Sequence, residues 1–277
     1  MTSPSQDDAV ELQEAPEPGP YDPTSFDSPW VKAVAPPVVA GMAILFQMSP
    51  LGFLLEGFHT WVHEFGHSSV AWMMGRRALP LPFGWSNIEQ DRSALVYVGV
   101  PVLLGILAVA GWRERKAWPM LLAAILLAAQ TLMTWRLGDD RGHMWMIFAG
   151  VGGEFYLSAA MMALFYFEFP EKFRWGGCRY VFLFIGSGVF YQSFAFWRLV
   201  KRGLEGIPYG SMINGEDDGG GDMNILRDDY QWTQHQIIYT YNHLADACIV
   251  ALLVVYAVFN LRIDRIFDRF LARCLAA

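Results

Sequence analysis

The chain has 277 residues, of which 54% are hydrophobic and only 17% are charged. Soluble domains are about one quarter charged, so this composition excludes an ordinary soluble enzyme and predicts an all-α polytopic membrane bundle of about six to seven transmembrane helices. The net charge of -7 excludes a basic nucleic-acid-binding surface, and the expected surroundings are a lipid bilayer.

The chain opens with an acidic leader, residues 1–30, which contains prolines but no lysine or arginine. Such a composition predicts disorder, and the leader lacks the positive stretch and apolar core of a signal peptide. The membrane domain is expected to cover residues 31–262. Its first helix, residues 31–48, should be interrupted at Pro36-Pro37 and is ended by Pro50.

The second apolar segment, residues 51–75, contains His63-Glu64-Phe65-Gly66-His67. Helical residues four apart share one face, so His63 and His67 can bind one zinc ion together, in the pattern known as HExxH. Glu64 lies beside them, placed to take a proton from a metal-bound water. Because ionisable groups inside a membrane are costly and usually functional, this segment predicts a catalytic zinc site at membrane depth.

Polar residues before the motif and a proline-containing segment after it complete this region. His59, one turn before His63, is expected to support the ligands from behind, and Glu56 is expected to line the approach to the site. Residues 78–93 contain Pro80 and Pro82 among apolar residues. They predict a re-entrant loop or a short extended hairpin that lies over the site.

Further apolar segments follow, at residues 93–112, 118–135, 143–167 and 180–199. Next comes the longest polar segment, residues 201–243, and loops of this length are usually functional or disordered. The last helix is expected at residues 244–261, before an amphipathic tail at 263–277. With seven spans, the two chain ends lie on opposite sides. Lysine and arginine then divide evenly between the sides, so the orientation stays open.

A catalytic zinc has three protein ligands and one open position, so a third ligand must come from outside the motif. The sequence offers three acidic candidates. Asp222 lies in a glycine-rich loop that could fold back into the membrane. Glu154 matches His63 in depth when both helices are counted from the same side. Asp246 begins the last helix.

The HEFGH motif on a membrane helix resembles the site-2-protease-type intramembrane zinc metallopeptidases. That family has an HExxH helix, a glycine-containing core helix with a polar residue, and a downstream aspartate as third ligand. Gly152-Gly153-Glu154 is similar to the second element, where the family more often has Gly-Pro and Asn. Asp222-Met223-Asn224 resembles an Asp-x-Asn element of bacterial relatives, and Asp218-Gly219-Gly220 is a partial match. The resemblance implies Asp222 as the third ligand and leaves Asp218 as an alternative, whereas the matching depth ranks Glu154 second.

The resemblance also implies a function. A divergent bacterial relative would be a zinc-dependent endopeptidase of the inner (plasma) membrane that cleaves a transmembrane segment of a membrane-protein substrate, with Glu64 as general base. Two alternatives fit the same residues: a non-proteolytic membrane protein that keeps the fold, and a metal-ion transporter with Glu56, His59, His63, Glu64 and Glu154 along its path. An enzyme needs one tight Zn²⁺ site, whereas a transporter needs several weaker ones.

Overall fold

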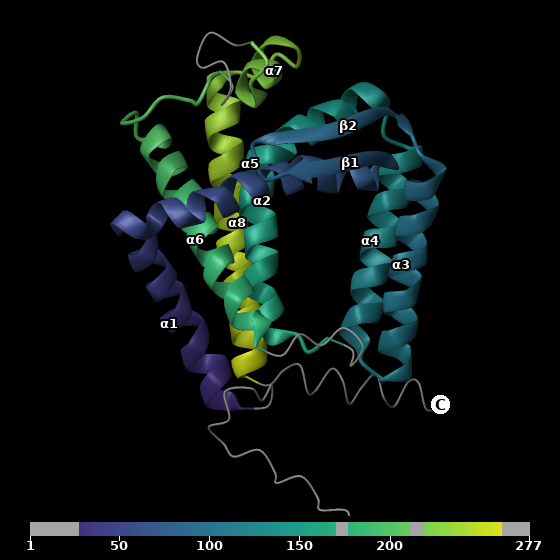
Figure 1. Cartoon of the computed structure of the whole chain (residues 1–277), viewed down its shortest axis with the longest axis vertical. Coiled ribbons are helices and arrows are strands. Elements are labelled where there is room, and N and C mark those ends of the chain that lie inside the picture. Colours follow the sequence, from purple (N-terminus) through teal and green to yellow (C-terminus); the bar gives the residue numbers. More distant parts are fainter. Residues whose placement is uncertain (1–27, 170–176, 211–218, 262–277) are drawn as a thin grey trace, which may run out of the picture.

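The computed structural model describes residues 28–169, 177–210 and 219–261. The first 27 residues of the acidic leader, the C-terminal tail and Asp218 lie outside this part of the chain. The elements, labelled in Figure 1, are α1 (Pro29–Gln47), η1 (Pro50–Gly52), α2 (Phe53–Met73), β1 (Arg76–Leu81), β2 (Trp85–Arg92), α3 (Ala94–Arg113), α4 (Ala117–Trp135), α5 (Asp139–Ala163), η2 (Leu164–Tyr166), α6 (Cys178–Lys201), α7 (Asp222–Asp228) and α8 (Gln234–Asn260).

Long apolar helices dominate the structure. Among the described residues, six helices are long and apolar enough to cross a membrane: α1, α3, α4, α5 together with η2, α6 and α8. Apart from the first part of α5, which runs crosswise above β2, these helices lie roughly along the long axis of the molecule (Figure 1). The predicted all-α polytopic bundle is therefore confirmed.

The helix that carries the HExxH motif is not one of the six candidate spans. Helix α2 lies across one end of the bundle instead of along it (Figure 1). The expectation of a span at residues 51–75 is therefore not met among the candidate spans, because α2 combines its apolar residues with Glu56, Glu64 and three histidines.

With six spans instead of seven, the start of α1 and the end of α8 lie on the same side of the bundle (Figure 1). The Tyr256 hydroxyl of α8 donates a hydrogen bond to the Ala33 carbonyl of α1 at 3.1 Å. The expectation that the outer ends of the first and last spans lie on opposite sides is corrected accordingly.

Helix α1 continues through Pro36 and Pro37, so the predicted interruption is also wrong. Each proline removes one backbone donor, and such a loss is tolerated in membrane helices that pack on their neighbours. Here α1 packs against α6 and α8. Its last residue, Gln47, donates from its side-chain amide to Gln192 of α6 at 3.1 Å.

The proline-containing segment forms an antiparallel hairpin, as its extended alternative predicted. Strand β1 pairs with β2, with Pro80 opposite Ser86. Proline is tolerated because a two-stranded sheet has only edge strands. The hairpin packs along α2, where the Trp72 indole donates to the Ala78 carbonyl at 3.1 Å. Strand β2 is thereby brought to the HExxH helix.

Helix α5 is the central support of the site, since it packs against α2, α6, α7 and α8. It meets α2 at backbone distance, because a Cβ built on Gly153 would lie only 2.4 Å from the Gly66 Cα. The main core fills the space around α5, α6 and α8 with large buried side chains, among them Phe155, Trp197 and Tyr241.

Candidate metal centre

The two motif histidines are held with their rings facing one point. Their Nε2 atoms lie 3.1 Å apart, as expected for residues one helical turn apart. The Nδ1 atom of His67 is 2.7 Å from the Met146 carbonyl of α5, and that of His63 is 2.7 Å from Glu154 Oε1. A carbonyl and a carboxylate only accept hydrogen bonds, so each Nδ1 carries the proton. Both Nε2 atoms are therefore turned towards the site as potential ligands.

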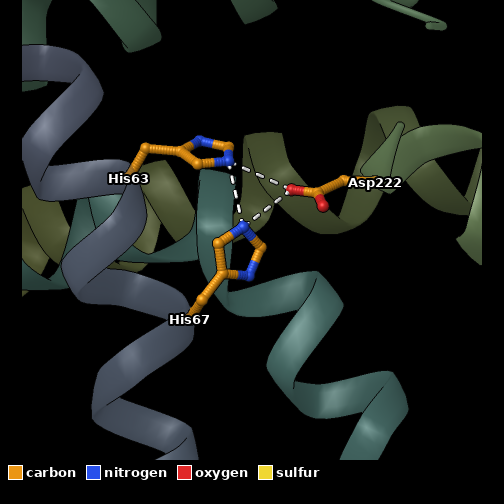
Figure 2. A group of neighbouring side chains, drawn as sticks. All are labelled: His63, His67 and Asp222. Atoms are coloured by element: carbon orange, nitrogen blue, oxygen red, sulfur yellow. Dashed lines mark hydrogen bonds and ion pairs between the residues drawn. The ribbon is translucent and has the colours of Figure 1, made fainter. Parts of the chain in front are cut away.

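Asp222 completes the group. Its Oδ2 atom lies 3.1 Å from His63 Nε2 and 3.3 Å from His67 Nε2, and the three side chains point towards one another in Figure 2. This Oδ2 atom is buried and has no hydrogen-bond partner in the described part of the chain. A buried acceptor without a donor is costly, which makes Asp222 a strong candidate for a bond to a cation.

The position of Asp222 is fixed by its neighbours in α7. Met223 and Leu226 are almost completely buried in the main core. The Asn224 side chain accepts a hydrogen bond at 2.7 Å from the backbone N–H of Gly210, on the far side of the intervening loop. Asp222 therefore lies at the start of an anchored short helix, and not in the re-entrant loop that the sequence suggested.

The electrostatics of the group favour a positive charge at its centre. Burial alone would lower the pKa of His63 and His67, but the carboxylates of Asp222 and, for His63, also of Glu154 act against it, so that the pKa of each ring is raised. Burial would likewise raise the pKa of Asp222, but the adjacent histidines shift it below its ordinary value. Two imidazole lone pairs and a carboxylate oxygen converge here, and a cation would satisfy all three.

The triangle of ligand atoms matches the size of a zinc site. Zinc binds nitrogen and oxygen at about 2.0–2.1 Å, so ligand atoms at tetrahedral corners lie about 3.3–3.4 Å apart. The three separations here are 3.1, 3.1 and 3.3 Å. Two histidines and one carboxylate are also a donor set that catalytic zinc sites use. The residues present therefore fit zinc.

Gly150 of α5 lies directly against the triad, although the sequence did not single it out. A Cβ built on Gly150 would come within 2.5 Å of Asp222 Oδ2 and within 2.6 Å of both His63 Nε2 and His67 Cε1. A larger residue would displace the ligand atoms. The sequence signal was the glycine cluster Gly150-Val151-Gly152-Gly153, of which the family resemblance used only the last two.

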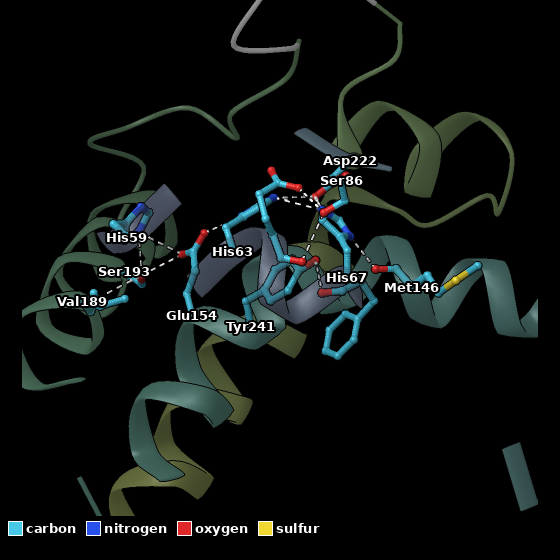
Figure 3. Close-up of polar contacts among 12 residues, drawn as sticks. His59, His63, His67, Ser86, Met146, Glu154, Val189, Ser193, Asp222 and Tyr241 are labelled. Carbon is cyan, nitrogen blue, oxygen red and sulfur yellow. Dashed lines mark hydrogen bonds and ion pairs between the residues drawn. The ribbon is translucent and has the colours of Figure 1, made fainter. Parts of the chain in front are cut away.

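Glu154 contacts His63 from the side away from Asp222, so it is not placed as a third ligand. Its buried carboxylate accepts from His63 Nδ1 and from Ser193 Oγ, both at 2.7 Å. His59 Nε2 lies 3.2 Å from the same carboxylate and 3.0 Å from Ser193 Oγ (Figure 3). Glu154 thus fixes the orientation of His63, and His59 and Ser193 in turn hold Glu154 in place.

The other acidic residues that the sequence singled out lie in different surroundings. Asp246 forms an ion pair with Arg198 of α6, which gives it a role in holding α6 and α8 together. Glu56 is exposed on α2. Asp222 is the candidate that the described structure brings to His63 and His67.

Glu64 is held by the hairpin. It is only 6% exposed, and its Oε2 accepts a hydrogen bond from Ser86 Oγ of β2 at 2.5 Å. Ser86 is a further residue that sequence reasoning missed, because only the folded hairpin brings it to α2. Through this bond the hairpin fixes the carboxylate next to the candidate metal ligands.

No protein-family model matches the chain, and neither a curated protein nor a solved structure matches it in sequence or fold. The resemblance to site-2-protease-type metallopeptidases therefore stays a prediction carried by the motif residues.

Proposed function

We propose that this protein is a zinc-dependent endopeptidase of the membrane, in which His63, His67 and Asp222 hold the metal. The observation that carries the proposal is the triangle of ligand atoms, with sides of 3.1, 3.1 and 3.3 Å. Beside it lies the buried Glu64, which follows His63 directly in the chain. Three protein ligands leave one tetrahedral position open, which distinguishes catalytic from structural zinc sites.

Bound zinc would supply Lewis-acid chemistry at this point, polarising a peptide carbonyl and lowering the pKa of water. Glu64 would act as the general base that takes a proton from the attacking water and passes it to the leaving amine. Ser86 would keep the Glu64 carboxylate oriented during this transfer. Glu154 would keep the Nδ1 proton of His63 in place, and with it the orientation of the ring.

The hairpin gives the site a means to hold an extended peptide. Within the described residues, β1 and β2 pair only with each other, so each strand has one edge that no other strand covers. Such edges bind extended segments by adding a strand. A peptide must be extended for its backbone to be attacked, and Ser86 places β2 beside Glu64.

The test is Glu64→Gln in the full-length protein. This variant should keep its zinc, since Glu64 is not one of the three ligands, and it should lose about 10²–10⁴-fold in turnover because the general base is gone. Cleavage of a fluorescent transmembrane substrate in liposomes measures turnover, and elemental analysis measures the metal. The control is Glu205→Gln, which removes an exposed carboxylate beyond the end of α6 and should change neither quantity.

Two results would contradict the proposal. One is cleavage by Glu64→Gln at the wild-type rate, which would remove the assigned base from the mechanism. The other is zinc flux through liposomes containing the wild-type protein without cleavage of any peptide, which would favour a transporter.

A further inference from the structure

Helix α2 has two opposite faces of different chemistry. Leu54, Phe58, Trp61 and Phe65 are spaced four, three and four residues apart, while Glu56, His59, His63 and His67 are spaced three, four and four apart. At about 100° per residue, each set forms one stripe, and the two stripes lie on opposite sides of the helix. The zinc-binding face is therefore directly opposite the apolar face.

The apolar stripe is exposed. Leu54 is 52% exposed, Phe58 38% and Trp61 40%. An exposed apolar stripe on a helix with polar, ionisable residues on its other face is typical of helices that lie in the membrane–water boundary. Tryptophan is itself enriched at that boundary.

Both ends of α2 meet the ends of candidate spans. The helix begins just after η1, where the Gly52 N–H donates to the Ser49 carbonyl beyond the end of α1. At its other end, the Met73 carbonyl accepts from Thr134, one residue before the end of α4. Twenty-one residues could cross a bilayer in about 30 Å, but α2 connects these span ends by lying across one end of the bundle (Figure 1).

We propose that α2 lies flat in the membrane–water boundary, with Leu54, Phe58 and Trp61 in the acyl chains and the zinc ligands facing the aqueous side. Asp222 fits this placement, because α7 belongs to the connection between two spans and not to a span. If the proposed peptidase function holds, the bond that is cut lies in the juxtamembrane segment of the substrate and not in the middle of its transmembrane helix.

The position of α2 can be tested without any activity. The three native cysteines are first replaced, and spin labels are then attached to single variants Leu54→Cys, Phe58→Cys, Trp61→Cys and Glu56→Cys. The depth of each label in liposomes is measured by its collision rates with oxygen and with a water-soluble nickel chelate. The stripe labels should lie at one shallow depth, and the Glu56 label should be more accessible to the chelate. Labels at Val98, Val102 and Val109 on exposed positions of α3 supply the depth profile of a spanning helix.

Two depth results would overturn this placement. A spanning α2 would separate the labels at Leu54 and Trp61 by about 10 Å in depth. A stripe that faces water would leave all three of its labels accessible to the chelate.

The predicted position of the cleaved bond is tested by mapping the cut in a single-span peptide with mass spectrometry. The cut should lie within about two helical turns of the membrane boundary, and four leucines inserted to lengthen the span should move it with the boundary. A cut that stays in the centre of the span would overturn this part of the inference. If zinc-loaded protein cleaves no peptide, the proposed function fails, while the label depths still decide the position of α2.

Discussion

His63 and His67 show what a short motif specifies and what it leaves open. Their spacing predicts a shared face, and in the structure their Nε2 atoms are 3.1 Å apart. The partners that orient the rings, Glu154 and the Met146 carbonyl, come from α5, about 80–90 positions further along the chain. No local pattern encodes those contacts, so the sequence could nominate Glu154 only by its depth and its resemblance to a family element.

The two carboxylates next to the histidines should differ in their effect on zinc binding. Asp222→Asn removes the charge and oxygen that face both Nε2 atoms, so we expect zinc affinity to fall by more than about 100-fold. Glu154→Gln keeps an acceptor for His63 Nδ1, and loss of such a supporting partner typically costs about 10–100-fold. Competition for zinc with a chelator of known affinity measures the zinc affinity of both variants.

Asp246→Asn is the control for loss of a carboxylate, because Asp246 pairs with Arg198 and not with the histidines. It should bind zinc like the wild type. A larger loss of affinity in Glu154→Gln than in Asp222→Asn would reverse the assignment of the third ligand.

At the scale of elements, the site depends on how closely α5 approaches α2. Gly153 meets Gly66 at backbone distance, and Gly150 lies against the triad. The sequence showed the glycines but not which of them face α2, because facing depends on how the two helices cross. The hairpin was predictable as an extended alternative, whereas the Ser86–Glu64 hydrogen bond follows only from its packing on α2.

The close approach at Gly150 predicts the effect of adding one methyl group. In Gly150→Ala, the new Cβ would fall within 2.5–2.6 Å of ligand-side atoms of Asp222, His63 and His67, far inside van der Waals contact. We expect zinc affinity to fall at least about tenfold while circular dichroism shows the same helix content. The control is Gly57→Ala on α2, where an added Cβ meets nothing within 4 Å. Normal zinc binding by Gly150→Ala would contradict the geometry.

At the scale of the whole molecule, runs of apolar residues predicted six of the helices because hydropathy and length decide whether a helix can span a bilayer. The same reasoning misassigned residues 51–75. A segment with an apolar stripe and a polar stripe can lie across the bundle or within it. Only its contacts with the ends of the spans, such as Thr134 with Met73, place α2 at one end of the bundle.

The central claim is that His63, His67 and Asp222 hold one zinc ion, and the metal content of the purified full-length protein tests it most directly. We expect about one zinc per chain in the wild type and almost none in the double variant His63→Ala/His67→Ala. Full zinc content in the double variant, or a wild-type protein that takes up no zinc when loaded, would contradict the claim.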